Sequence, residues 1–210
     1  MKKLTTILLL LFSLYGVAYA DTHAAATCEN KAGQLDVQTA VDLAASGDTV
    51  TVPAGSCTWD TQLTIGAGIT LQGVDTPVIT SAVGTGVKLI VYTAPGVTTF
   101  RITGFTFDIN ANSSGIKTTY ESSTSTNIRI DHNSFLNCLF ADSNTVIYID
   151  GTFQGIVDNN VFTGYPHIDN YGNGAGGTTS WDATTFSFGS AQNIYFEDNT
   201  FTADSPTGVY

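Results

Sequence analysis

Short runs in which apolar and polar residues alternate fill the chain from residue 49 onward. The runs are rich in β-branched and aromatic residues, and Gly, Asn, Asp, Ser or Pro stands between them, which is typical of short β-strands joined by turns. The predicted strands are TVTVPA, LTI, ITLQGV, PVITS, VKLIVY, TTFRITGFTFDI, NIRIDHNSF, TVIYID, GIVDNNVF, TTFSFG and NIYFEDNTF. This pattern indicates an all-β fold, but a sandwich or a barrel would show it as well as a solenoid.

One amphipathic helix precedes these strands. Residues 37–45 carry apolar side chains at the spacing i, i+3, i+4 and i+7, which places them on one helical face. Asp36 stands where an N-terminal cap is expected, and Gly47 stands where the helix is expected to end. No further amphipathic helix is predicted.

Four of the strand-forming runs align with one another and predict a repeat. Their ends are separated by 28, 27 and 39 residues, and the longest interval contains the Gly-rich insertion 164–177. The aligned stretches are FRITGFTF (100–107), IRIDHNSF (128–135), GIVDNNVF (155–162) and IYFEDNTF (194–201). A repeat of this size, with several short strands and no helix, predicts a solenoid of β-coils stacked about 4.8 Å apart.

Stacking of coils would arrange equivalent residues in columns. We expect a column of phenylalanine rings inside the solenoid and, beside it, an inward ladder of asparagine side chains that bond to the coils above and below. The phenylalanines are Phe107, Phe135, Phe162 and Phe201, and the asparagines are Asn133, Asn160 and Asn199. The helix at 37–45 is expected to close the N-terminal end, where a strand edge would otherwise be open.

The start of the repeat region resembles a known family. The stretch DVQTAVDLAASGDTVTVPAGSCTW, followed by LTIGAGITLQG, is similar to the N-terminal cap and first coil of right-handed parallel β-helix proteins of the pectate-lyase-like superfamily, and the later runs of type I-x-I-x-x-N-x-F are similar to its coils. The resemblance covers residues 36–210 and implies a right-handed parallel β-helix with a short N-terminal capping helix. It implies less about activity, because the superfamily contains lyases, hydrolases, esterases, epimerases, tailspikes and adhesins.

Residues 1–20 have the layout of a secretory signal peptide. Two lysines precede an apolar run and a small-x-small cleavage site, and that run is shorter than the ~20 residues of a spanning helix. The expected organisation is a signal peptide (1–20), an N-terminal segment (21–35) and a β-helix domain (36–210). The mature chain is expected to be extracellular or periplasmic and to have no membrane attachment.

The chain ends in ADSPTGVY, which has the pattern of the approach to another coil. We therefore expect either an incomplete chain or an open C-terminal end that is covered by another subunit through an end-to-end or oligomeric contact.

Cysteine usage fits an oxidising compartment. Cys28 and Cys57 can close the start of the fold as a disulfide, which would leave Cys138 over as a small buried apolar residue. Spacing alone does not determine the connectivity.

The net charge argues against two classes of partner. The chain has 7 basic and 18 acidic residues, and loss of Lys2 and Lys3 with the signal peptide leaves five basic residues against 18 acidic ones, a formal charge of −13. A chain this acidic is not expected to bind nucleic acid or anionic membrane by bulk charge.

The repeat alignment predicts two outward-facing columns, because side chains alternate along a strand. The first column is Arg101, Arg129, Ile156 and Tyr195, and the second is Thr103, Asp131, Asp158 and Glu197. Carboxylates stacked about 5 Å apart repel one another unless a cation or a proton lies between them, and oxygen ligands suit Ca²⁺. The alternative is a solvated acidic face on which Arg129 acts as a partial counter-ion.

The resemblance extends to the stretch NIRIDHNSF, which is similar to the W-I-D-H-N stretch of secreted pectate lyases. It implies that Asp131 is a calcium ligand, with Asp158 and Glu197 as companions, and that calcium assists β-elimination of a uronic-acid polymer. Arg129 stands at the tryptophan position and no R-x-P-x-x-R stretch is present, so Arg101 and Arg129 receive the catalytic role by position alone. Lys88 and Lys117 are better bases chemically, but the sequence does not place them on this face.

Two other functions stay open. A glycoside hydrolase needs two carboxylates, and Asp131 with Asp158 or with Glu197 has a suitable spacing. A non-catalytic carbohydrate-binding module, adhesin or fibre would use aromatic side chains as stacking surfaces for sugars. Those aromatic residues are Tyr165, Tyr171, Trp181 and Tyr195. His132 is expected to turn away from Asp131, because adjacent residues in a strand point to opposite faces.

Overall fold

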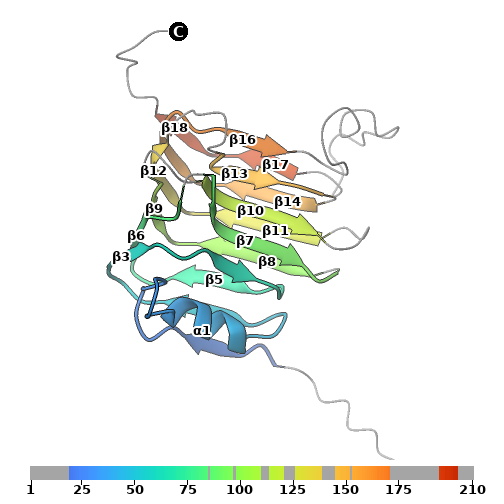
Figure 1. Ribbon diagram of the computed structural model, residues 1–210. Helices are drawn as coiled ribbons and strands as arrows, with labels where there is room; N and C mark the ends of the chain where they lie inside the picture. The colour runs from blue at the N-terminus through green and yellow to red at the C-terminus, as the bar shows by residue number, and fades with distance from the viewer. Residues whose placement is uncertain are drawn as a thin grey trace, which may run out of the picture.

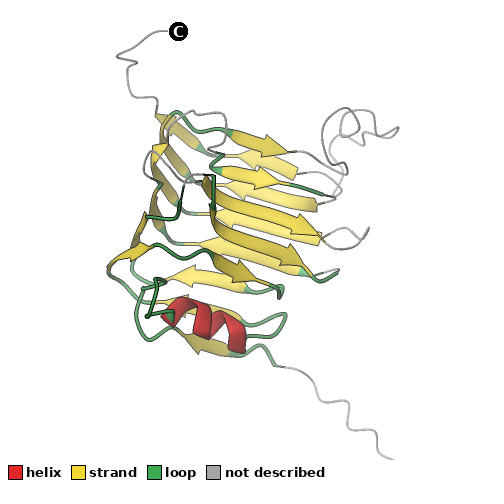
Figure 2. Ribbon diagram, viewed as in Figure 1, coloured by secondary structure: helices red, strands yellow, loops and turns green. Residues whose placement is uncertain are grey.

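The computed structural model describes residues 19–84, 86–96, 98–109, 114–120, 126–138, 145–151, 153–170 and 194–202. In these residues the strands form three all-parallel sheets wound around one core (Figures 1 and 2). The predicted all-β parallel β-helix with a short helix is therefore confirmed, and a sandwich or a barrel is excluded.

Each coil crosses sheet 1, then sheet 2, then sheet 3. Sheet 1 contains, in spatial order, β1 (Thr22–Ala24), β2 (Thr49–Val52), β5 (Thr70–Gly73), β8 (Thr99–Thr103), β11 (Thr126–Asp131), β14 (Phe153–Asp158) and β17 (Ile194–Glu197). Sheet 2 contains β3 (Ser56–Trp59), β6 (Val78–Ser81), β9 (Thr106–Asp108), β12 (Ser134–Cys138), β15 (Val161–Gly164) and β18 (Thr200–Thr202). Sheet 3 contains β4 (Leu63–Ile65), β7 (Lys88–Ala94), β10 (Ser114–Tyr120), β13 (Ile147–Ile149) and β16 (Ile168–Asn170).

The coils stack in the register that the repeat alignment predicts. Arg129 on β11 pairs with Arg101 on β8 and with Ile156 on β14, and Ile156 pairs in turn with Tyr195 on β17. The long interval before β17 is therefore one coil with an insertion. Equivalent residues lie above one another, which is the condition for the predicted columns.

The interior column of phenylalanines is present. Ring centroids lie 5.5 Å apart between Phe107 and Phe135, 5.0 Å apart between Phe135 and Phe162, and 4.9 Å apart between Phe162 and Phe201. The first three side chains are fully buried, whereas Phe201 is 56% exposed in the last described coil. Stacked aromatic contacts of this kind add to the hydrophobic stabilisation of a core.

The asparagine ladder is also present, at the corner between sheets 1 and 2. The amide of Asn133 donates to the carbonyl of Ile102 in the preceding coil at 3.1 Å, and the backbone N–H of Asn133 donates to Oδ1 of Asn160 at 3.0 Å. The amide of Asn160 donates to the carbonyl of Ile130, and its N–H donates to Oδ1 of Asn199. The ladder therefore supplies partners for backbone groups that the turn would otherwise leave buried and unpaired.

The helix α1 (Asp36–Leu43) covers the N-terminal end of the solenoid, below the first coil in Figure 1. Two details of its predicted ends are wrong. Leu35 occupies the N-cap position and makes no side-chain cap bond, while Asp36 lies inside the first turn. The helix ends before an extended Ala44, and Gly47 lies in the turn that follows, with a φ of 100°.

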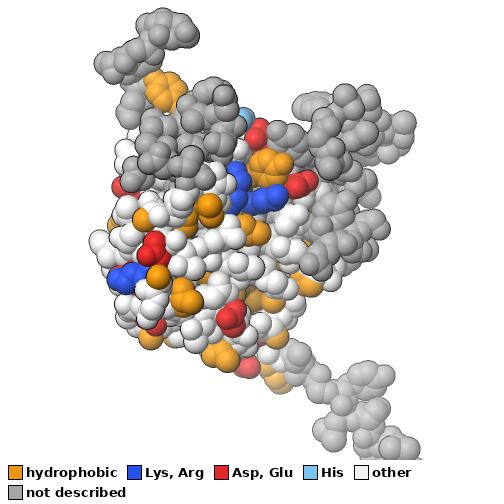
Figure 3. Space-filling model, in the orientation of Figure 1, with side chains coloured by type: hydrophobic (Ala, Val, Ile, Leu, Met, Phe, Trp, Pro, Cys, Tyr) orange, Lys and Arg blue, Asp and Glu red, His pale blue; other side chains and the backbone are white. Residues whose placement is uncertain are grey.

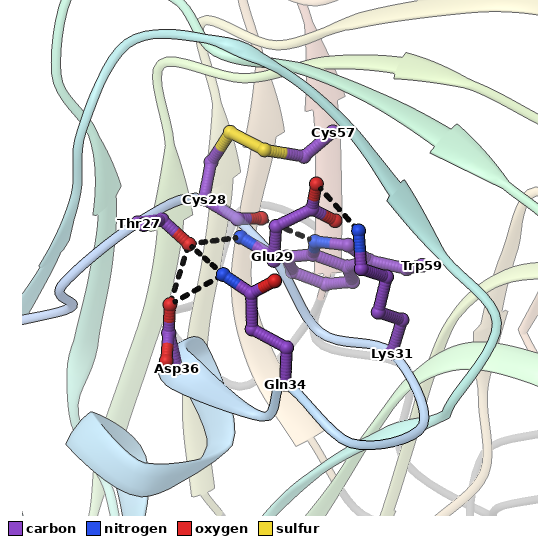
Figure 4. Close-up of a disulfide and its surroundings, with 8 residues drawn as sticks. All are labelled: Thr27, Cys28, Glu29, Lys31, Gln34, Asp36, Cys57 and Trp59. Atoms are coloured by element: carbon purple, nitrogen blue, oxygen red, sulfur yellow. Dashed lines mark hydrogen bonds and ion pairs between the residues drawn. A yellow bond between two sulfur atoms is a disulfide. The ribbon is translucent and has the colours of Figure 1, made fainter.

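The N-terminal segment is joined to the first coil by a disulfide between Cys28 and Cys57, whose Cα atoms are 5.8 Å apart (Figure 4). Beside it, Nε1 of the buried Trp59 donates to the carbonyl of Cys28 at 2.8 Å, and the hydroxyl of Thr27 donates to Asp36 at 2.6 Å. The segment 21–35 also contributes β1, which pairs with β2. This part of the chain is therefore continuous with the β-helix.

Four described strands, β1, β3, β10 and β16, were not predicted. Their sequences are THA, SCTW, SGIKTTY and IDN. Three of them show no regular apolar alternation, and SCTW alternates over four residues only. These segments become strands because neighbouring coils pair with them, and tertiary pairing overrides local propensity. The predicted strand TTFSFG lies outside the described residues.

The asparagine ladder leads to a prediction about stability. Asn160→Ala should lower the free energy of unfolding by roughly 3 kcal/mol, because it leaves several buried backbone groups without partners at about 1–3 kcal/mol each. Urea unfolding followed by circular dichroism measures the loss. Asn127→Ala removes an exposed asparagine from β11 and should change stability by less than about 0.5 kcal/mol. Equal losses in the two variants would contradict a structural role for the ladder.

Candidate functional site

The outward face of sheet 1 carries both predicted columns of polar side chains. Ile128 and Ile130 point into the core, so the alternation of β11 turns Arg129 and Asp131 to the outer face. Asp131 pairs in register with Asp158, and Asp158 pairs with Glu197. The sequence therefore placed these residues on the correct strands and in the correct order.

The two columns are linked by ion pairs that run diagonally from one coil to the next. Nε and Nη2 of Arg101 donate to the two oxygens of Asp131 at 2.7 and 2.6 Å. Nε and Nη2 of Arg129 donate in the same way to Asp158 at 3.1 and 2.9 Å. Such two-pronged contacts are among the strongest hydrogen bonds in proteins. We call these four residues the arginine–aspartate ladder.

The expectation that the acidic column is exposed is wrong for two of its members. Asp131 is 0% exposed and Asp158 is 4% exposed, because each carboxylate lies beneath an arginine from the preceding coil. Glu197 is exposed, since its diagonal neighbour in the preceding coil is Ile156 and no basic side chain in the described part of the chain pairs with it. The arginine–aspartate ladder thus ends where the arginine column ends.

His132 contradicts the expected strand alternation. Its φ of 54° places it in the left-handed region, and this bend brings Nδ1 to 2.8 Å from Oδ2 of Asp131. Gly104, Asn159 and Asp198 occupy the same corner in other coils and also have positive φ. The signal was present in the sequence, because Gly, Asn, Asp and His are the residues that tolerate this conformation.

The resulting dyad joins a buried carboxylate to an exposed imidazole. The His132 side chain is 60% exposed, whereas that of Asp131 is 0% exposed. Because an ionised carboxylate only accepts hydrogen bonds, Nδ1 of His132 donates in this contact, and Nε2 is the ring nitrogen that Asp131 does not engage. Sequence reasoning did not assign His132 to the site.

The electrostatics of the ladder keep Asp131 ionised and both arginines charged. Burial raises the pKa of Asp131, but hydrogen bonds from Arg101 and His132 and the charges of Arg101 and Arg129 outweigh it, so the pKa lies below its ordinary value. The hydrogen bonds to Asp131 and Asp158 raise the pKa of Arg101 and Arg129 respectively. Neither arginine is therefore suited to accept a proton.

A calcium ion fits poorly among these carboxylates. The oxygens of Asp131 already accept hydrogen bonds from Arg101, Thr103 and His132. A divalent cation at that position would be repelled by two guanidinium groups. The aspartate carboxylates would also have to break their ion pairs with these groups before they could bind the cation. Among the described residues, no group of three His, Cys, Asp or Glu side chains is arranged to hold a metal ion. The calcium site stays a prediction that this arrangement does not favour.

The remaining predicted site residues are not gathered on one surface. Tyr195 continues the arginine column on β17, and Tyr165 follows β15, with its N–H donating to the carbonyl of Cys138. Tyr171 and Trp181 lie outside the described residues. Two carboxylate pairs are expected for a hydrolase, Asp131 with Asp158 and Asp131 with Glu197. Arginines cover Asp131 and Asp158, whereas Glu197 is exposed.

A separate hollow of about 490 Å³ lies at the opposite ends of the sheet 1 strands. It is lined by Ser46, Gly47, Gly68, Thr70, Thr98 and Thr99. None of these side chains titrates, so the hollow offers hydroxyl groups for hydrogen bonding but no acid or base.

Comparisons with known proteins leave the family open. A scan against protein-family models returns no match for this chain, and a search of curated proteins finds no significant relative. Within the described residues, no helix is long and apolar enough to cross a membrane.

The ladder predicts that Asp131 is important for stability. Asp131→Asn should lower the free energy of unfolding by about 2–3 kcal/mol, because Arg101 loses its charged partner while its exposed edge stays solvated. Glu197→Gln is the matched control and should have little effect, since Glu197 is exposed. Denaturant midpoints of the three proteins decide between this result and a ladder that contributes nothing.

The pKa shift predicts acid sensitivity with a definite sign. The folded-state pKa of Asp131 lies below the ordinary value of 3.8, so its contribution is complete above pH 3.8 and is lost as the pH falls through the lower folded value. Melting temperatures measured from about pH 2 to pH 6 should fall at the acid end, and less steeply in Asp131→Asn. Asp36 and Asp48 are shifted in the same direction, so some acid sensitivity should remain in the variant.

Proposed function

We propose that the protein is a secreted member of the pectate-lyase-like superfamily that cleaves an acidic extracellular polysaccharide by β-elimination, with His132 as the base. The observation that carries the proposal is the contact between Nδ1 of exposed His132 and buried Asp131 beside two arginines. The disulfide between Cys28 and Cys57 supports an oxidising, extracytoplasmic location.

His132 has the features of a general base. Asp131 accepts from Nδ1, which orients the ring of this exposed side chain and leaves Nε2 to act as the base. Asp131 is itself held by Arg101, so the orientation of the imidazole is set by a buried network. This chain of contacts corresponds to the arrangement in which a third group positions a catalytic base.

The arginines supply positive charge for the substrate carboxylate. Nε and Nη2 of Arg129 both donate to Asp158, so Nη1 is the nitrogen that would meet a substrate carboxylate. The side chains of Arg101 and Arg129 are 38% and 42% exposed, so both can be reached from solvent. The positive charge of Arg129 would neutralise a uronate carboxylate, and this would make the adjacent C5 proton more acidic.

The elimination then balances as follows. Nε2 of His132 takes the C5 proton, and the electrons of the C5–H bond form a double bond between C5 and C4. The C4–O bond breaks, and its electron pair leaves with the glycosidic oxygen, which takes a proton from solvent. Neither a calcium ion nor an arginine base is needed for these steps.

A second candidate is a non-catalytic glycan-binding module. The arginine–aspartate ladder favours this candidate, because each arginine already has an acidic partner. In this case the ion pairs would have a purely structural role, joining one coil to the next. Outward polar and aromatic side chains would then provide a binding surface without chemistry. Binding without product in the experiment below would support it.

The test is ultraviolet detection of unsaturated uronate with pectate, alginate and glycosaminoglycans as substrates. We expect product from the folded protein and a loss of roughly 10²-fold or more in His132→Asn, the expected contribution of a general base. The asparagine reproduces the corner found at Asn159, where Nδ2 contacts Asp158 at 2.8 Å, so geometry is retained while the base is removed.

Two controls make the result decisive. Asn127→Ala, on the same strand, should keep wild-type activity. A chelator should leave the product unchanged if His132 acts without metal, whereas product lost with chelator would support the calcium prediction instead. A folded protein with no product on any polymer, or full activity in His132→Asn, would refute the proposed mechanism.

A further inference from the structure

A second cluster of ionisable side chains lies on the outer face of sheet 3. Lys117 on β10 pairs in register with Tyr148 on β13, which pairs with Asp169 on β16. Lys88, on β7, reaches across a coil to the same tyrosine: its Nζ lies 5.1 Å from the ring centroid, and that of Lys117 lies 5.0 Å away. In Figure 3 basic atoms meet hydrophobic and acidic atoms over these strands. Lys88, Lys117 and Tyr148 form what we call the lysine cluster.

The charges in the lysine cluster are incompletely paired. Nζ of Lys117 lies 3.5 Å from Asp150, a long ion pair. Asp169 contacts His167 at 2.8 Å and accepts from the hydroxyl of Thr145 at 3.2 Å. Among the described residues, no carboxylate oxygen lies within 4.0 Å of the Lys88 ammonium. Within the described part of the chain, Lys88 is thus a half-buried cation without a direct acidic partner.

This arrangement disfavours the charge on Lys88 when nothing else is bound. Burial and the neighbouring charge of Lys117 lower the pKa of Lys88, and Asp169 offsets this only in part. Two ammonium groups held near one ring are stabilised when an anion lies between them, because the anion compensates both charges and accepts their hydrogen bonds. Two cations beside one ring, of which Lys88 has no acidic partner among the described residues, therefore favour an anionic ligand.

We propose that the lysine cluster binds the anionic group of an acidic sugar, a carboxylate or a sulfate, between the ammonium groups of Lys88 and Lys117. That the ligand is a sugar rests on the function proposed above, whereas the anion site itself rests on the side chains of sheet 3. The cluster lies on sheet 3, whereas His132 lies at the corner that follows sheet 1, so the cluster would hold a polysaccharide and take no part in the elimination.

The acids around the lysine cluster limit what it accepts. Asp150 and Asp169 flank the two lysines, so a densely charged ligand would meet repulsion as soon as it extended beyond them. One anionic group per sugar, facing the ammonium groups, fits better than a cluster of charges. The surrounding chain is strongly acidic, which makes this local pair of cations a selective point of attachment.

Calorimetric titration with two probes tests the site: hexagalacturonate carries carboxylates, and a chondroitin sulfate hexasaccharide carries sulfates as well. Both are titrated into the His132→Asn protein, which cannot cleave them if His132 is the base. Lys88→Met retains the aliphatic stem and should weaken binding by about tenfold or more, the effect of one charged hydrogen bond. Lys117→Met should do the same. Lys31→Met, a basic residue near the disulfide, should change the affinity by less than about twofold.

Acetic anhydride labelling of the His132→Asn protein, read by mass spectrometry, gives a second measurement that needs no lysine variant. Saturating hexagalacturonate should protect Lys88 and Lys117 but not Lys31. Affinity equal in all three lysine variants, or no protection of Lys88, would refute the site.

The outcomes separate the two proposals. Lysine-dependent binding by a protein that forms no unsaturated product would keep the anion site and reject the elimination. Tighter binding of the sulfated probe, with the same lysine dependence, would assign the site to sulfate. Product formation together with unaltered binding in the lysine variants would keep the elimination and reject only the anion site.

Discussion

The in-register stacking of one coil on the next is the constraint on which the rest of the molecule depends. It is maintained at the corner between sheets 1 and 2, where Asn133, Asn160 and Asn199 bond to the coils on either side. A slip of one residue would turn every inward side chain of a strand to the outer face. The ladder of buried amides therefore fixes which side chains form the core and which face solvent.

Stacking also creates an electrostatic problem, because like charges at equivalent positions of neighbouring coils would lie only about 4.8 Å apart. Diagonal ion pairs between neighbouring coils offset this repulsion. An arginine in one coil reaches the aspartate two positions further along in the next, so Arg101 neutralises Asp131 and Arg129 neutralises Asp158. The side-by-side arginines are thereby balanced as well. Where Ile156 replaces the arginine, the acid of the following coil, Glu197, is left in solvent.

The same coils present chemically different surfaces on different sheets. Sheet 1 carries a closed network of ion pairs with one exposed imidazole, whereas sheet 3 carries two lysines over one tyrosine. A solenoid allows this separation because each sheet has its own outward columns while all three share one core. Under the proposed function, these two surfaces would hold and cleave one polysaccharide from different parts of the protein.

The sequence by itself determined the class of fold, the register of the later coils and the identity of both interior columns, because apolar alternation and the recurring Asn and Phe are local patterns that repeat at measurable intervals. It also placed Arg101, Arg129, Asp131 and Asp158 on one face. It could not show that the aspartates are buried, since their cover comes from residues about 30 positions away. Tertiary structure alone decided that His132 bends back to Asp131 and that Lys88 and Lys117 meet at Tyr148, because a turn conformation and contacts between coils, rather than local alternation, bring those side chains together.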